Sequence, residues 1–201
     1  AVHFVCATVF VSSRFLGSSI SEWSGAKFWL IFFFGILFIV ATANYYNFMD
    51  GINGIAGLTG TIAFSFLGLF GLYEGKDIAW VAMAFGVSVA CLGFLPLNFP
   101  RAKVFMGDVG SILLGFLFTS WVLWFSQSLL EFVVLTSFLF PFYVDELSTL
   151  IVRIKDRDRL TEAHRRHIYQ ILANQAGFSH AFVTLLYGTV QIVVVFLAWM
   201  A

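Results

Sequence analysis

Three short polar segments stand out in a chain that is otherwise apolar, and the first sets an acid between two amides. Asn47, Asp50 and Asn53 recur every third residue in the sequence NYYNFMDGINGIAG, between two apolar stretches. On a helix this spacing would place the three side chains near one face. A carboxylate at such a boundary is costly unless it lines a polar cavity or meets a cation. The segment indicates a metal or ligand site; the alternative is a polar turn whose glycines serve helix packing.

The second segment, NFPRAKVFMGDVGS, precedes another apolar stretch. We expect Ser111 to cap the N-terminus of the helix that follows, which would leave free N–H groups and the positive end of the helix dipole facing the loop. Such an end binds phosphate, and Asp108 beside it could hold a Mg²⁺ ion that bridges the same phosphate. The alternative is an ordinary loop before a capped helix.

The third segment is basic and ends in the sequence HRRHIYQ. His164 and His167 lie three residues apart, so on a helix both could face one ligand, and Arg165 and Arg166 stand between them. Zinc is disfavoured because no His-Glu-x-x-His pattern or cysteine pair accompanies the histidines. Arginine and histidine suit a diphosphate better. A routine basic loop at a membrane surface is the alternative.

The composition defines where these segments must work. Of 201 residues 60% are apolar and only 11% are charged, against about 25% charged in soluble domains. A soluble fold of this size could not hide so much apolar surface, and disorder requires the opposite composition. Eleven basic residues balance eleven acidic ones, so no basic surface indicates binding to nucleic acid. The chain is predicted to be an integral membrane protein.

Long apolar runs predict an all-α polytopic membrane protein with about seven transmembrane helices. The runs are continuous and lack the alternation of a membrane barrel, and backbone groups in lipid must be satisfied within their own segment. We find no internal repeat and expect one domain over residues 1–201. The expected spans are 1–13, 28–43, 55–73, 78–97, 111–130, 131–152 and 180–200.

Basic residues give these spans an orientation. Alternating spans place the loops 44–54, 98–110 and 153–179, and with them all three polar segments, on one side of the membrane. Eight of the eleven Lys and Arg residues lie in these loops, which makes that side cytoplasmic by the positive-inside rule. Asp145 and Glu146 fall inside the expected span 131–152, where an acid pair needs a polar cavity or a cation.

Together and in this order, the segments NYYNFMDGINGIAG, AKVFMGDVGSILLGF and HRRHIYQ resemble those of the polyprenyl-phosphate N-acetylhexosamine-1-phosphate transferases. The resemblance covers residues 28–175, and the form HRRHIYQ is more similar to bacterial members that start O-antigen and related surface glycans. It implies transfer of a sugar 1-phosphate from a UDP-N-acetyl sugar to polyprenyl (undecaprenyl) phosphate, with release of UMP. The reaction would take place at the cytoplasmic face of the bacterial plasma membrane with Mg²⁺, or with Mn²⁺ in its place.

The resemblance also implies roles for individual residues. Asp108 would be the metal ligand, Asn47 and Asp50 would belong to the same centre, and Asp50 could take up a proton. His164 and His167 would contact the sugar nucleotide and act in catalysis. The residues expected to bind substrate are Asn53, Lys103, Arg165 and Arg166. Asn53 stands where many members carry a second Asp.

One family feature is absent from this sequence. Members carry a paired-aspartate motif on an earlier cytoplasmic loop, and no such pair occurs here before residue 50. We therefore expect the chain to be the C-terminal part of a longer family domain.

Two other classes of function compete with the transferase. In a transporter, Asp50, Asp108 and Asp145 would be intramembrane ion or proton sites. Transport predicts acids in mid-span, whereas Asp50 and Asp108 are expected at the cytoplasmic ends of spans, as are the histidines. A noncatalytic scaffold would leave the acids and histidines without a use. The sequence selects neither the sugar nor an oligomeric state.

Overall fold

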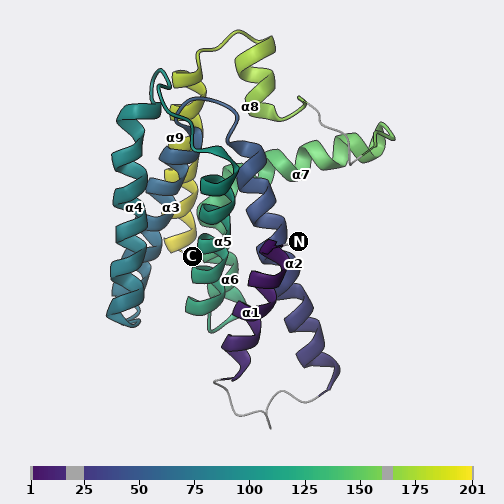
Figure 1. The fold of residues 1–201 in the computed structure, drawn as a ribbon, viewed down its shortest axis with the longest axis vertical. Coiled ribbons are helices and arrows are strands. Elements are labelled where there is room, and N and C mark those ends of the chain that lie inside the picture. Colours follow the sequence, from purple (N-terminus) through teal and green to yellow (C-terminus); the bar gives the residue numbers. More distant parts are fainter. Residues whose placement is uncertain (1, 17–24, 160–164, 201) are drawn as a thin grey trace.

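The computed structural model describes residues 2–16, 25–159 and 165–200, and in these ranges the chain forms helices, turns and loops without any strand. Figure 1 shows the helices as an elongated bundle with α7 projecting from it. The helices are α1 (Val2–Leu16), α2 (Ala26–Met49), α3 (Ile55–Tyr73), α4 (Ile78–Asn98), α5 (Gly107–Phe125), α6 (Leu129–Thr136), α7 (Phe140–Lys155), α8 (Ile168–Gln170) and α9 (His180–Met200).

Five of the described helices are long and apolar enough to cross a membrane: α2, α3, α4, α5 and α9. The expectation of an all-α polytopic membrane protein is therefore confirmed. The number of about seven spans is not confirmed. Helix α1 has 15 residues, fewer than the ~20 that cross the hydrocarbon core, and the expected span 131–152 is not a single helix.

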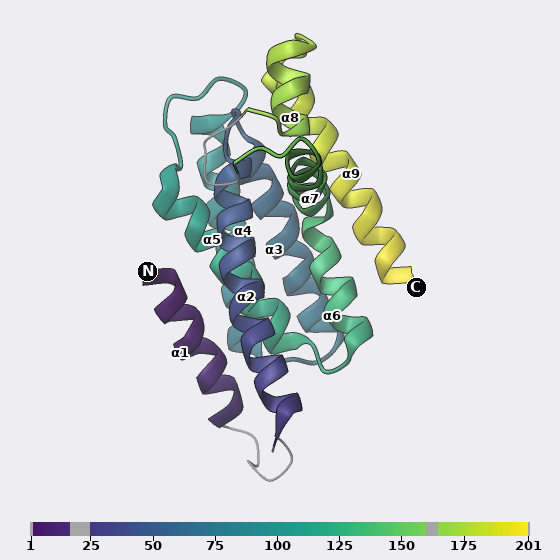
Figure 2. The ribbon, with the colours of Figure 1, turned by 90° about the vertical axis from the view of Figure 1, so that its right-hand side faces the viewer.

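The break within 131–152 corrects the sequence-based expectation. The structure divides this stretch into α6, a 3₁₀ turn at Ser137–Leu139, and α7. Pro141 stands in the first turn of α7, where its fixed φ favours a new helix start. From there α7 runs sideways out of the bundle, as both ribbon views show (Figures 1 and 2). Its charged residues, which include Arg153 and Lys155 in the last turn, are costly in lipid.

Helix α3 is the centre of the bundle. In its 18-residue apolar stretch 67% of the residues are buried, against 28% in that of α2 and 22% in that of α4. Its Phe64 ring meets Phe118 and Trp121 of α5 edge-on, with ring centroids 6.4 and 6.0 Å apart, an arrangement that adds to the burial of the rings. The outward faces of α2, α4 and α9 carry large exposed apolar side chains, among them Leu37, Leu92 and Leu197, which suits contact with lipid tails.

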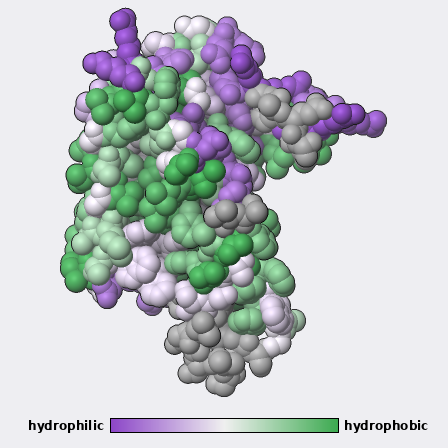
Figure 3. Space-filling view, viewed as in Figure 1, coloured by the Kyte–Doolittle hydropathy of each residue, from purple (hydrophilic) through white to green (hydrophobic). Residues whose placement is uncertain are grey.

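Polar residues gather at one end of the molecule. The α2–α3 turn, the α4–α5 loop and α8 all lie at the end of the bundle drawn uppermost in Figure 1. Figure 3 shows that hydrophilic residues concentrate at this end and along α7, while apolar residues cover much of the bundle between the ends. The described parts of the three polar segments thus lie at a common end, as the alternation of spans predicts. We call it the polar end.

Candidate active site at the polar end

The first polar segment spans a helix end and a turn. Helix α2 ends at Met49, and the backbone N–H of Asp50 donates to the carbonyl oxygen of Asn47 at 3.2 Å. Asn53 lies in the turn before α3. The prediction that Asn47, Asp50 and Asn53 share one helical face is therefore wrong, because the helix stops before Asp50. Gly54 closes the turn with a φ of 85°, which only glycine adopts without strain.

Asn98, at the C-terminus of α4, joins the first segment to the second. Its side chain is buried; Oδ1 accepts the N–H of Gly54 at 2.6 Å and Nδ2 donates to the carbonyl of Val104 at 2.8 Å. A longer hydrogen bond also joins these two segments: Nδ2 of Asn53 donates to the carbonyl oxygen of Pro100 at 3.2 Å. Sequence reasoning missed Asn98 as a site residue. The one available signal was a polar amide at the end of an apolar run, which needs a partner when buried.

Ser111 does not cap the helix, which corrects the second expectation. Helix α5 begins one turn earlier, at Gly107, and its N-cap residue Met106 makes no side-chain capping bond. Ser111 is fully buried, and its hydroxyl donates to Oδ1 of Asn47 at 2.6 Å. Asp108 lies in the first turn of α5 and is exposed. The bond from Ser111 therefore brings the last turn of α2 beside the helix start that carries Asp108.

The two carboxyl groups of this centre interact. Burial, together with the negative charge of Asp108, raises the pKa of Asp50 to about 7. Like charges close together resist joint ionisation, and a cation between them removes that resistance. Asp50 and Asp108 thus form a local concentration of negative charge, which would attract a cation, although the formal net charge of the chain is zero.

The donor set of this centre fits one kind of metal. Within the described ranges no group of three His, Cys, Asp or Glu side chains could hold an ion. The available ligands are oxygens, from the carboxylates of Asp50 and Asp108 and from the amide of Asn47. Mg²⁺ is bound in this way, through one or two carboxylates, with the remaining positions filled by water and substrate phosphate. Zinc would require imidazole or thiolate ligands.

The third segment contacts the same end through Tyr169. Its hydroxyl donates to the carbonyl oxygen of Phe48, in the last turn of α2, at 2.9 Å. Arg165 and Arg166 precede it and are exposed, and Nη1 of Arg166 binds Asp156 at 2.7 Å and Asp158 at 2.8 Å. His164 lies outside the described residues. Lys103 is exposed in the α4–α5 loop at the same end.

His167 is buried, with 3% of its surface exposed. Its Nδ1 lies 3.4 Å from Oδ1 of Asp145 and 3.6 Å from Oε1 of Glu146, and its ring is stacked on that of Tyr169 at 5.8 Å. The acid pair that the sequence placed in the span 131–152 therefore faces an imidazole from the third segment. A direct role of His167 in binding the sugar nucleotide stays a prediction.

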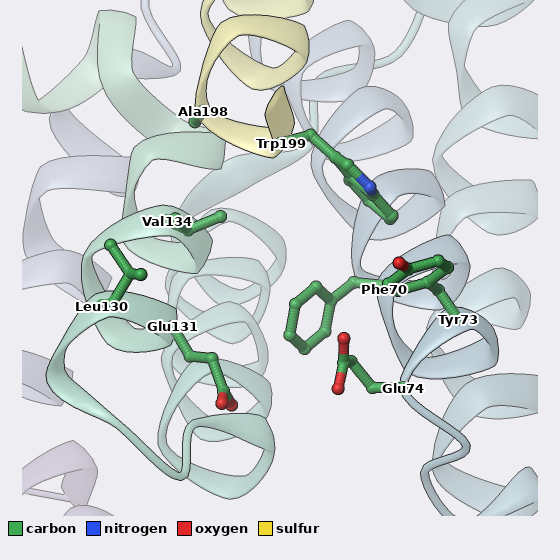
Figure 4. Close-up of a pocket in the computed structure, with 8 residues that line it drawn as sticks. All are labelled: Phe70, Tyr73, Glu74, Leu130, Glu131, Val134, Ala198 and Trp199. Carbon is green, nitrogen blue, oxygen red and sulfur yellow. The ribbon is translucent and has the colours of Figure 1, made fainter. Parts of the chain in front are cut away.

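A separate pocket lies at the other end of the bundle. Figure 4 shows the aromatic rings of Phe70, Tyr73 and Trp199 on one side of it, and the carboxylates of Glu74 and Glu131 near its edge. None of the expected site residues lines it. The lining residues are Phe70, Tyr73, Glu74, Leu130, Glu131, Val134, Ala198 and Trp199.

Comparison with known sequences gives a family match. The model of glycosyl transferase family 4 matches residues 1–126. A phospho-N-acetylmuramoyl-pentapeptide-transferase of Microcystis aeruginosa is 43% identical over 103 residues, which are 50% of this chain and 28% of the relative. A probable undecaprenyl-phosphate N-acetylglucosaminyl 1-phosphate transferase of Bacillus subtilis is 30% identical over 158 residues, which are 76% of this chain and 43% of the relative. The chain spans less than half the length of these curated relatives.

Proposed function

Because this chain belongs to glycosyl transferase family 4, we propose that it forms part of a membrane enzyme that transfers an N-acetylhexosamine 1-phosphate from a UDP-sugar to polyprenyl phosphate. The observation that carries the proposal is the joining of Asn47 to Ser111 at 2.6 Å, which sets Asp50 and Asp108 at one helix junction. The names of relatives support a phosphosugar transfer: one is an undecaprenyl-phosphate N-acetylglucosaminyl 1-phosphate transferase.

The proposed reaction joins two anions. An oxygen of the lipid phosphate attacks the β-phosphorus of the UDP-sugar, and the bond from that phosphorus to the oxygen bridging it to the α-phosphate breaks. UMP leaves with the bridging oxygen, and the product is a lipid diphosphate sugar. Such a transfer depends mainly on positioning the reactants and on offsetting their negative charge.

The residues at the polar end suit these tasks. Asp108 and Asn47 would hold Mg²⁺, or Mn²⁺ in its place, and a bound divalent ion would neutralise charge on the diphosphate. Asp50, whose pKa lies at about 7 in the absence of a cation, could accept a proton from the lipid phosphate. Asp108 stands in the first turn of α5, and the unpaired N–H groups of a first helical turn favour anions.

The remaining predicted residues would bind the UDP-sugar, which is the donor of the sugar 1-phosphate. We assign donor binding to Asn53, Lys103, Arg165 and Arg166, and the catalytic contacts of the third segment to His164 and His167. Lysine and arginine offset phosphate charge, and arginine can bind phosphate through two N–H groups. From the similarity of HRRHIYQ to bacterial members that start surface glycans, we infer that the product starts such a glycan.

We place the site on the cytoplasmic face of the bacterial plasma membrane. The support is the distribution of charge: the α4–α5 loop and the segment 153–166, which begins in the last turn of α7, hold eight of the eleven Lys and Arg residues of the chain, and short segments rich in these residues stay in the cytoplasm.

The geometry disfavours the transporter. Asp50 follows the end of α2, Asp108 stands in the first turn of α5, and Asp145 belongs to α7, which is not among the candidate spans. The three acids named for transport therefore lie at helix ends or beside the bundle. A mid-membrane binding site, as transporters have, would need acids within the spans.

The test uses the full-length protein in lipid nanodiscs with polyprenyl phosphate. UMP release is followed over a panel of UDP-N-acetyl sugars, and the lipid phosphate is omitted as a control. We expect release that depends on the lipid and on one or two of the sugars. A folded full-length protein that releases no UMP with any sugar would overturn the proposal, and substrate accumulation in vesicles would then be measured.

A further inference from the structure

Asp145 is a buried carboxylate that holds the backbone of the third segment. It lies in α7 with 1% of its surface exposed. Its Oδ1 accepts the N–H of Ile168 at 2.8 Å, and its Oδ2 accepts the N–H of Tyr169 at 2.9 Å and the hydroxyl of Tyr187 at 2.5 Å. One side chain thus ties together α7, the start of α8, and α9.

These donors explain how an acid can be buried here. Burial by itself would raise the pKa of Asp145, but the His167 side chain, the Tyr187 hydroxyl and the two backbone N–H groups together outweigh it, so the pKa lies below the usual value. The carboxylate also meets the first free N–H groups of the short helix α8, where negative charge is favourable. The contact therefore fixes where this helix begins.

Tyr169 carries the contact on to the candidate active site. Besides its hydrogen bond to the carbonyl of Phe48, its phenol ring lies against Gly51, and a Cβ atom at position 51 would overlap the ring. Both contacts are made beside Asp50. Tyr169, whose backbone N–H Asp145 holds, therefore contacts with its side chain the segment that carries Asn47 and Asp50.

We propose that Asp145 is a positioning residue: it fixes the turn His167–Gln170, whose Tyr169 contacts the end of α2, and it thereby places Arg165 and Arg166, which directly precede this turn. His167 belongs to this anchor, because its Nδ1 faces Asp145. A role of Arg165 and Arg166 in binding the diphosphate of the UDP-sugar rests on the proposed function. The anchoring of the turn by Asp145 is independent of that function, so the two roles are tested separately.

The anchor is tested by amide hydrogen exchange of the full-length protein in nanodiscs. Asp145→Asn leaves one acceptor oxygen where two N–H groups and a hydroxyl now converge. We expect exchange in the peptide covering 165–175 to become roughly 10- to 100-fold faster, the range for loss of hydrogen bonds to a charged acceptor. Glu146→Gln is the matched control: it neutralises the adjacent buried acid and leaves both acceptor atoms of Asp145 in place. Unchanged exchange in Asp145→Asn would overturn the proposal.

The consequence for the donor is tested by the kinetics of UMP release. In Asp145→Asn we expect the KM for the UDP-sugar to rise about tenfold and kcat to fall, because His167 stands in the same turn, while the KM for the lipid phosphate changes less than about threefold. Should this variant fail to fold, Tyr187→Phe removes one donor to Asp145 and is expected to show the same pattern at smaller size. Faster amide exchange in Asp145→Asn with an unchanged KM for the UDP-sugar would overturn the assignment of Arg165 and Arg166 to UDP-sugar binding. A wild-type protein without UMP release would contradict the proposed function, and the exchange result would still decide the anchor.

Discussion

The hydroxyl of Ser111 donates a 2.6 Å hydrogen bond to Oδ1 of Asn47, across 64 residues of sequence. It joins the second turn of α5 to the last turn of α2, so two polar segments that are separate in sequence become one site. Because the amide oxygen that accepts this bond is also a proposed metal ligand, the bond orients that ligand from outside the metal's own coordination shell.

Ser111→Ala is expected to lower UMP release by about 10- to 100-fold, the usual effect of losing a residue that orients a metal ligand. The fold should persist, since the change removes one hydroxyl. The measurement is UMP release against divalent cation concentration, which should shift to higher concentrations. Ser120→Ala is the control: Ser120 is also buried in α5, but its hydroxyl donates to the carbonyl of Phe116 in its own helix. Equal activity in the two variants would contradict the role given to Ser111.

Asn98→Leu is expected to destabilise the protein by about 1–3 kcal/mol, because the buried N–H of Gly54 loses its acceptor. The expected result is a lower Tm of the protein in detergent. Asn53→Ala is the comparison: it removes a longer, exposed bond to the carbonyl of Pro100 and should cost less than about 1 kcal/mol. A Tm of Asn98→Leu equal to that of the wild type would show that the two segments are not joined through Asn98.

The helical segments and the common end of the three polar segments could be predicted from the sequence. The apolar runs fix which segments are helical, and alternation of spans brings the segments around Asp50, Asp108 and His167 to one end. Hydropathy could not reveal the break at Ser137–Leu139, because the residues of this turn are as apolar as a span.

The side-chain partners could not be predicted. Asp145 accepts hydrogen bonds from backbone N–H groups that lie 23 and 24 residues away in the sequence. These hydrogen bonds depend on the direction in which α7 leaves the bundle. Ser111 has the residue type of a helix cap, and only the start of α5 at Gly107 shows that its hydroxyl serves Asn47 instead.

Affinity for a divalent cation is expected to fall with falling pH. Asp50 has a pKa of about 7 without a cation, so below that pH a proton neutralises its carboxylate, which then no longer attracts an ion held by the neighbouring Asp108. Between pH 8 and pH 6 the affinity should weaken about tenfold, as one proton displaced at a pKa near 7 requires. The measurement is a Mn²⁺ binding titration at both pH values. In Asp50→Asn this dependence should flatten, and a wild-type affinity that is equal at both values would contradict the shifted pKa.

Gly51→Ala is expected to destabilise the protein by about 1–3 kcal/mol, the usual cost of forcing an extra methyl group into a packed site. The added carbon would overlap the phenol of Tyr169, and the hydroxyl oxygen is the nearest atom. In the background of Tyr169→Phe, which lacks that oxygen, the same change should cost less. Tm values of the two single variants and the double variant give the coupling; strictly additive effects would show that Gly51 and Tyr169 do not meet.

We propose that Asp108 helps to hold a metal ion that the transfer requires. The measurement is UMP release by the full-length protein in nanodiscs, with Mg²⁺, with EDTA, and in Asp108→Asn. Asp77→Asn is the control, because Asp77 caps α4 at the other end of the bundle and asparagine caps equally well. We predict release that EDTA abolishes and Mg²⁺ restores, and a loss of at least about 100-fold in Asp108→Asn alone. Release that survives EDTA, or an Asp108→Asn variant as active as the wild type, would contradict the account.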